Sequence, residues 1–176
     1  MDAVRKSDGY TVNDIYALPD GERAEVMDGT IYYMAPPGRF HQQISMFLTN
    51  KISRYIEEHQ GGCEIYAAPF AVFLNKDDRN YLEPDISVIC DTSKLDEKGC
   101  HGAPDWVIEI VSPSSRTRDY FKKLFKYRSA GVREYWVVDP AKKAVNVYQL
   151  EHETGGEYFF GEDVPVGIFE GFSIRI

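Results

Sequence analysis

The feature that most constrains how this chain can fold is an apolar segment with one carboxylate inside it, Trp106-Val107-Ile108-Glu109-Ile110-Val111. A short apolar run of this kind is typical of a strand buried within a sheet. Strand alternation places Glu109 on the face shared by Val107 and Val111. An ionised carboxylate on a buried face is costly unless a cation or hydrogen-bond donors meet it. The segment therefore predicts a central strand that carries a polar site.

A second acidic residue stands at the start of another apolar segment, Asp85-Ile86-Ser87-Val88-Ile89-Cys90. If the two segments form neighbouring strands, Asp85 and Glu109 bring two carboxylates to one place. Mg²⁺ accepts one or two protein carboxylates, keeps several waters and completes its octahedron with substrate phosphate. A structural alternative stays open at this point, in which Asp85 caps the strand entrance and Glu109 pairs with an arginine.

The first sixty residues predict a helix, a hairpin and a second helix. Thr11 and Asp14 have the spacing of a capping box, which opens a short helix ending near Pro19. Asp28-Gly29, between two apolar runs, predicts a hairpin over residues 23–34 with Glu25 on its first strand. Between the breaks at 36–38 and 61–62, apolar residues at helical spacing predict a long amphipathic helix. These are Ile44, Phe47, Leu48, Ile52, Tyr55 and Ile56.

The rest of the chain is rich in predicted strands. We expect one strand over residues 64–74, a hairpin of 135–138 with 144–150, and a β-rich tail from Tyr158 onward. One basic helix interrupts them over residues 117–130, with Gly131 as its C-cap. This order predicts an α/β fold with a mixed central sheet flanked by helices and with additional β-hairpins. A chain of 176 residues with 43% hydrophobic residues is expected to form one domain over residues 1–176.

Charge is distributed unevenly along the chain. The net charge of −8 opposes nucleic acid as a partner, but residues 116–133 carry +6 and leave −14 for the remainder. An equally open interpretation is a solvated helix face that balances acidic neighbours. The basic residues of this segment are Arg116, Arg118, Lys122, Lys123, Lys126, Arg128 and Arg133.

Lys123 occupies a special position on the predicted basic helix. At about 100° per residue, Lys122 and Lys126 point away from the apolar side, and Lys123 falls on its border. Lys123 alone could lean toward the sheet while keeping its ammonium in a cleft, where it could orient or deprotonate a water. The alternative is a stem that covers the core edge with its charge in solvent. The wheel places Tyr120, Phe121, Leu124, Tyr127 and Arg128 on the apolar side.

Several chemistries and locations are disfavoured. The three cysteines, Cys63, Cys90 and Cys100, contain no CxxC pair and predict neither a disulfide framework nor a thiolate zinc cage. Cys100-His101 is interpreted as part of a polar loop. Ser112 and Ser114 lack the Gly-x-Ser-x-Gly elbow, and no phosphate-binding glycine loop occurs. The first thirty residues contain no continuous apolar run, so we expect a cytoplasmic protein without a membrane segment.

Taken in order, these segments resemble the Uma-two family of restriction endonucleases, which belongs to the PD-(D/E)xK nuclease superfamily. The resemblance extends over nearly the whole chain, and the spacing of its motifs makes the combined match specific. Its motifs are Glu25, Asp28-Gly29, His41, Glu83-Pro84-Asp85-Ile86, Pro104-Asp105, Val107 to Ser114, Asp119 with Lys123 and Tyr127, and Gly131 to Pro140.

The resemblance implies roles for individual residues. Asp85 corresponds to the aspartate of the PD motif and Glu109 to the second acidic residue, so both are expected to ligate the metal, with the backbone carbonyl of Ile110 as a third contact. Val111 stands where the superfamily usually has its lysine. The family pattern supplies this amine from the following helix, at Lys123.

Three further residues enter the site through the resemblance. Glu25 is similar to the acidic residue that the superfamily's first helix directs at the site, although here it falls on a strand. Tyr127 accompanies Lys123 in the family pattern. His41 falls in the first turn of the long helix, on its apolar face, and is interpreted as a core histidine, with a catalytic role as the alternative.

The resemblance implies a Mg²⁺- or Mn²⁺-dependent endonuclease acting on DNA. Water activated beside the ion attacks phosphorus in line, and departure of the 3′ oxygen leaves a 5′-phosphate. DNA is expected to contact Arg116, Arg118, Lys122 and Lys126. An alternative from another class is a catalytically silent nuclease fold that serves as a binding or scaffold module, as a homodimer through the hairpin around Tyr148.

Overall fold

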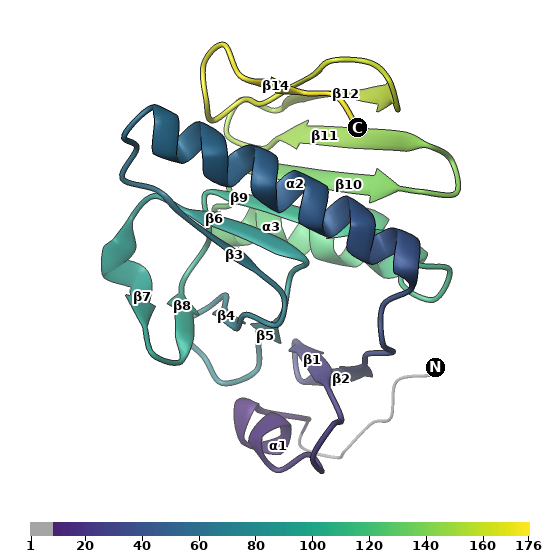
Figure 1. The fold of residues 1–176 in the computed structure, drawn as a ribbon. Helices are drawn as coiled ribbons and strands as arrows, with labels where there is room; N and C mark the ends of the chain where they lie inside the picture. The colour runs from purple at the N-terminus through teal and green to yellow at the C-terminus, as the bar shows by residue number, and fades with distance from the viewer. Residues whose placement is uncertain (1–8) are drawn as a thin grey trace.

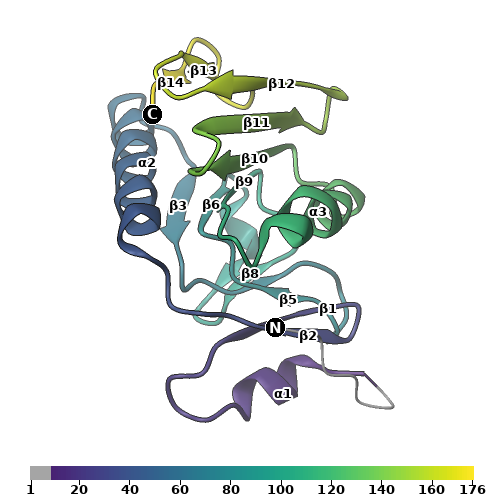
Figure 2. The same ribbon diagram turned by 90° about the vertical axis from the view of Figure 1, so that its right-hand side faces the viewer.

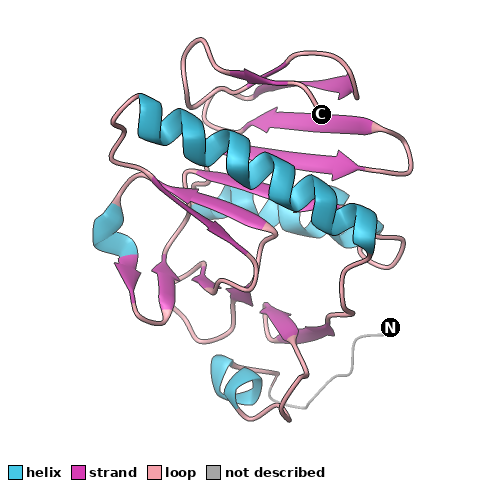
Figure 3. Ribbon diagram, viewed as in Figure 1, coloured by secondary structure: helices cyan, strands magenta, loops and turns pink. Residues whose placement is uncertain are grey.

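The computed structural model describes residues 9–176, and its centre is a six-stranded sheet with the order β12-β11-β10-β9-β6-β3. β9 and β10 run parallel, whereas every other neighbouring pair is antiparallel, so the sheet is mixed as predicted. Helices lie on both of its faces (Figures 1 and 3). The strands are β3 (Glu64–Ala67), β6 (Ile86–Ile89), β9 (Trp106–Ile110), β10 (Glu134–Asp139), β11 (Ala144–Gln149) and β12 (Thr154–Phe159).

One face of this sheet is covered by α2 (Arg39–Glu58), which crosses the strands in Figure 1. Its buried residues are spaced by four and pack on β6, β9 and β10, which confirms the predicted amphipathic helix. No helix within residues 9–176 is both long and apolar enough to cross a lipid bilayer. The buried residues of α2 are Ile44, Leu48, Ile52 and Ile56.

The opposite face is covered by the predicted basic helix, which begins with a π-helical segment, η2 (Arg118–Lys123), and continues as α3 (Leu124–Ala130). Figure 2 shows α2 and α3 on opposite sides of the strands. Gly131 ends the helix in the left-handed conformation (φ 94°), as expected for a C-cap glycine.

The buried residues of this helix recur at every fourth position, as they do along α2, and they are Ser115, Asp119, Lys123 and Tyr127. The predicted placement of Phe121 on the apolar side is wrong, since 71% of this residue is exposed.

A second six-stranded sheet, with the order β2-β1-β5-β4-β8-β7, lies beyond the first, and the short helix α1 (Val12–Tyr16) packs against it (Figure 2). The predicted hairpin is confirmed as β1 and β2, with Asp28 (φ 49°) and Gly29 (φ 72°) forming a turn that needs the left-handed region. The segment 64–74 is two strands of different sheets, β3 and β4, because the Pro69 between them cannot donate to a ladder.

The bounds of the remaining elements follow. The second sheet contains β1 (Ala24–Met27), β2 (Thr30–Tyr33), β4 (Val72–Phe73), β5 (Tyr81–Leu82), β7 (Leu95–Asp96) and β8 (Gly99–His101). A 3₁₀ turn, η1 (Thr92–Lys94), precedes β7. The β-rich tail adds a small hairpin of β13 (Val164–Pro165) and β14 (Ser173–Ile174).

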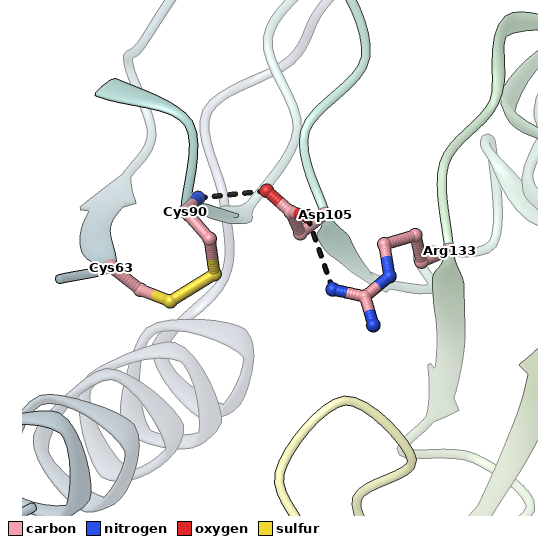
Figure 4. Close-up of a disulfide and its surroundings, with 4 residues drawn as sticks. All are labelled: Cys63, Cys90, Asp105 and Arg133. Atoms are coloured by element: carbon pink, nitrogen blue, oxygen red, sulfur yellow. Dashed lines mark hydrogen bonds and ion pairs between the residues drawn. A yellow bond between two sulfur atoms is a disulfide. The ribbon is translucent and has the colours of Figure 1, made fainter. Parts of the chain in front are cut away.

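A disulfide joins Cys63 to Cys90, so the prediction that the cysteines form no disulfide is wrong (Figure 4). The two residues flank paired strands, since Glu64 of β3 lies opposite Ile89 of β6. This antiparallel pairing brings cysteines 27 positions apart in the sequence side by side. Cys100 is free and buried.

Candidate active site

The pairing of β6 with β9 brings the two predicted carboxylates together. Ile86 lies opposite Ile108 in antiparallel register, which sets Asp85, just before β6, beside the end of β9. The backbone N–H of Ile110 donates to Asp85 Oδ2 at 2.7 Å. Glu109 lies on the face shared by Val107 and Val111, and this confirms the orientation predicted by strand alternation.

Glu109 is almost completely buried and is held by two donors. Lys123 Nζ donates to Glu109 Oε1 at 2.7 Å, and the Tyr127 hydroxyl donates to the same oxygen at 2.8 Å. Only 4% of Glu109 and 2% of Lys123 are exposed, so the ammonium lies beneath the surface and not in a solvated cleft. Of the alternatives left open for these two residues, neither an arginine partner for Glu109 nor a solvated Lys123 is found within residues 9–176.

Glu25 comes from the second sheet and completes this cluster. Lys123 Nζ donates to Glu25 Oε1 at 2.8 Å, and the backbone N–H of Glu83 donates to the same oxygen at 3.1 Å. Arg118 Nε lies 3.8 Å from Glu25 Oε2. The β1–β2 hairpin thus supplies the acidic residue that the resemblance expects at the site, and supplies it from a strand.

Asp119 is a member of the cluster to which the sequence analysis assigned no role. It lies one turn before Lys123, with Oδ1 3.9 Å from Nζ, and only 2% of the residue is exposed. Its position one helical turn before the predicted amine was the available signal. Lys123 therefore faces three carboxylates, those of Glu25, Glu109 and Asp119.

Buried carboxylates outnumber the buried ammonium in this cluster, and this imbalance determines their pKa values. Burial raises the pKa of Glu109 to about 8, with further increases from Asp119, Asp85 and Glu25, whereas Lys123 opposes the rise. Burial likewise raises the pKa of Asp119 to about 6. Burial lowers the pKa of Lys123, but the surrounding carboxylates outweigh it and hold this pKa above its usual value. The surrounding carboxylates therefore favour the charged form of Lys123, and burial favours the neutral form of Glu109.

Asp85, Glu109 and Lys123 line a pocket of about 780 Å³, and His41 lines it with them. His41 Nε2 lies 3.1 Å from Asp85 Oδ2, so this histidine belongs to the pocket and its interpretation as a core residue is wrong. The reason is that the first turn of α2 extends past the buried stripe, which starts at Ile44. Burial lowers the pKa of His41, but the contact with Asp85 outweighs burial and raises this pKa above 6.5.

The four residues expected to contact DNA have different surroundings. Arg118 lines the pocket, whereas Arg116 pairs with Asp139 on β10. Lys122 and Lys126, which the wheel placed away from the apolar side, are not buried, and both reach the β1–β2 hairpin. Lys122 Nζ donates to the Tyr32 hydroxyl at 3.0 Å, and Lys126 pairs with Asp28.

The pocket also has residues that no sequence pattern identified. Arg39 and Phe40 lie in the first turn of α2, and Tyr33 ends β2. All three line the pocket. Gly38 is the N-cap residue of α2 and has no side chain to cap the helix. Because Gly38 lines the pocket, the positive end of the α2 dipole lies at this wall. Aromatic residues in a hairpin or a helix look like ordinary packing residues, so the sequence contained no signal for them.

Carboxylate oxygens remain open to a cation. Both donors to Glu109 reach Oε1, and both contacts of the Asp85 side chain reach Oδ2. Among residues 9–176, no group of three or more His, Cys, Asp or Glu side chains is arranged to hold a metal ion. Two carboxylates with free oxygens fit an ion that takes most of its ligands from water and substrate, as Mg²⁺ does.

The mixed sheet between helices, with an acidic pair on adjacent strands, defines a restriction-endonuclease-like fold. Residues 12–176 match the Uma2 family, described as "Putative restriction endonuclease", and the chain belongs to this family.

Two relatives extend the comparison. A crystal structure titled as a putative nuclease belonging to DUF820 from Anabaena variabilis ATCC 29413 superposes with a TM-score of 0.75 over 94% of each chain. Its sequence identity of 22% limits this likeness to the fold. The "Uncharacterized protein slr1290" of Synechocystis sp. (strain ATCC 27184 / PCC 6803 / Kazusa) is 27% identical over 128 residues. That match spans 72% of this chain and 66% of the relative, just under two thirds of its length.

Proposed function

We propose that this protein is a metal-dependent endonuclease that hydrolyses phosphodiester bonds of DNA. The observation that carries the proposal is the meeting of Asp85, Glu109 and Lys123 at one pocket, although they come from three separate elements. A buried ion pair is weak evidence for a purely stabilising role, because desolvation offsets much of its attraction. Family membership supports nuclease chemistry for this arrangement.

Asp85, Glu109 and the carbonyl of Ile110 would hold the cation, Mg²⁺ or Mn²⁺. Hard oxygen donors are the ligands that these ions prefer. When bound there, the ion would lower the pKa of a coordinated water and offset the charge that develops on the phosphoryl oxygens.

The other residues have roles that their protonation states define. Lys123 is charged, so it donates hydrogen bonds to the nucleophilic water or to a phosphoryl oxygen and does not act as a general base. Glu25 and Asp119 hold the ammonium in this state, and Tyr127 fixes Glu109 Oε1. His41 orients Asp85 through the contact between Nε2 and Oδ2.

The test is cleavage of supercoiled plasmid by the purified chain in Mg²⁺ or Mn²⁺, with and without chelator. We expect nicked circles that carry 5′-phosphates, produced only when the divalent ion is present. Asp85→Asn should abolish nicking, whereas Lys94→Met, a change outside the pocket lining, should not.

The competing function is a silent nuclease fold that binds without cleaving. Absence of nicking with either ion, together with Mn²⁺ binding that Asp85→Asn leaves unchanged, would refute the endonuclease and favour that alternative. Nicking that persists in chelator would refute the metal dependence.

A further inference from the structure

We infer that the pocket takes its phosphodiester from a single-stranded stretch of nucleic acid, with neighbouring bases stacked on Tyr33 and Phe40. The inference rests on the proposed function, because it assigns the bound strand to the same pocket. It adds the class of substrate, a strand whose bases are unpaired.

The first observation is the depth of the polar cluster. Glu109 and Lys123 are 4% and 2% exposed, so a phosphodiester must enter the pocket to reach them. Duplex DNA is stiff over about 150 base pairs, and each of its phosphates is fixed beside paired and stacked bases. A single strand can bend its backbone into a concave site and turn its bases outward. Enzymes that modify a base inside a pocket likewise take it from a single strand or extrude it from the duplex.

The second observation is that large rings are exposed along the pocket. Tyr33 is 37% and Phe40 is 51% exposed, and both belong to the pocket lining. They lie on either side of the link 34–38 between β2 and α2, of which residues 35–38 are exposed. Aromatic side chains beside a backbone-binding groove are the usual platforms for unpaired bases, because every base has a face that can stack.

The third observation is that cations lie next in sequence to Phe40 and against the ring of Tyr32, the neighbour of Tyr33, while the pocket floor is acidic. Arg39 is exposed at the pocket beside Phe40, and Arg118 lies with its guanidinium carbon 5.3 Å from the centre of the Tyr32 ring. Lys122 Nζ lies 5.1 Å from the same ring centre. Arg39 and Arg118 line the pocket, and their charges suit the phosphates that flank the reacting group, in a chain of net charge −8.

The experiment compares the affinity of the full chain for a fluorescein-labelled single-stranded 15-mer and for the blunt duplex of the same sequence. Fluorescence anisotropy is measured in chelator, so that binding is read without cleavage. We expect the single strand to bind at least about tenfold more tightly than the duplex. Tyr33→Ala and Phe40→Ala should each weaken single-strand binding about 5- to 100-fold, and Phe40→Trp should retain it.

The controls are exposed aromatic residues outside the pocket lining. Tyr16 on α1 (58% exposed) and Phe159 on β12 (55% exposed) match the two test positions in residue type, and their change to alanine should leave affinity unaltered. Circular dichroism of each variant checks that it is folded.

Equal affinity for the two forms, tighter binding of the duplex, or no binding of either would overturn the inference. So would folded Tyr33→Ala and Phe40→Ala variants that bind like the parent. Failure of the proposed function can be told apart from failure of this inference. In that case the chain does not nick plasmid in Mg²⁺ or Mn²⁺, but it still binds the single strand more tightly than the duplex in chelator.

Discussion

Replacement of Lys123 by Met tests both the buried cluster and the proposed chemistry. The change keeps most of the stem and removes an ammonium that lies 2.7 Å from Glu109 Oε1 and 2.8 Å from Glu25 Oε1. Placement of Lys123 in a solvated cleft would predict little change in stability. Its burial predicts a large change, because both carboxylates remain in the interior without their cation.

The magnitude follows from the cost of leaving buried charges unpaired. Removal of one partner of a buried ion pair costs about 3–5 kcal/mol, and here one cation serves three carboxylates. Protons can replace the cation at low pH. Lys123 lowers the pKa of Glu109 and of Asp119, so its removal raises both. The folded variant then binds more protons than the unfolded chain, and its stability falls as the pH rises.

The assay is urea unfolding of the metal-free protein in chelator at pH 6 and at pH 9. Trp106 and Trp136, both fully buried, report unfolding through their fluorescence. We expect the free energy of unfolding of Lys123→Met to fall by about 3–5 kcal/mol at pH 9 and by less at pH 6. Lys122→Met is the matched control. It loses one hydrogen bond to Tyr32 and a cation–π contact at the surface, which together contribute about 1 kcal/mol or less.

Two further measurements complete the test. Adding Glu109→Gln to Lys123→Met should recover part of the lost stability, because the anion that the lysine paired is removed as well. Under conditions where the variant is folded, cleavage by Lys123→Met should be about 10²-fold slower or more, with Mn²⁺ binding retained. A stability loss at pH 9 no greater than that of Lys122→Met would refute the buried cluster, and parent-like cleavage would refute the role of the amine.

Three other changes have defined outcomes. Asp85→Asn should abolish Mn²⁺ binding in calorimetry, and unchanged affinity would exclude Asp85 as a ligand. In chelator, the free energy of unfolding of the parent should fall between pH 4.5 and about 8 as Glu109 ionises, because the pKa of Glu109 is raised in the folded state. Urea unfolding of Glu109→Gln over the same pH range should not show this fall. Cys63→Ser should lower the free energy of unfolding by about 3–4 kcal/mol, the value for a cross-link spanning 27 positions, and a reduced parent as stable as the oxidised one would contradict this.

Elements with local signals were predictable from the sequence. The Thr11–Asp14 capping box opens α1, the Asp28-Gly29 turn joins β1 to β2, and Gly131 ends α3. In each case the signal and the structure that it specifies lie within a few residues of each other. The central strands were predictable for a related reason, since burial on both faces requires a continuous apolar run.

The disulfide and the helix winding depend on distant contacts and were not predictable in this way. Cys63 and Cys90 meet only because β3 pairs with β6 in one register. The wheel assumed α-helical winding, whereas the segment from Arg118 to Lys123 is a π-helix. The segment mixes charged and aromatic side chains, which occur in either winding, so composition does not separate the two.

Site residues were detectable when they broke a local pattern. Glu109 stands out because a carboxylate interrupts an apolar strand, and its cost in isolation signals a partner elsewhere. Lys123 breaks no pattern, since a lysine on the border of an amphipathic helix is ordinary. The helical wheel and the family resemblance together distinguished it from Lys122 and Lys126. Its burial requires that Glu25 and Glu109 converge from different sheets on one helix turn. The acid that breaks the apolar pattern thus marks where the site lies, whereas the burial of its lysine partner follows only from the assembled sheets.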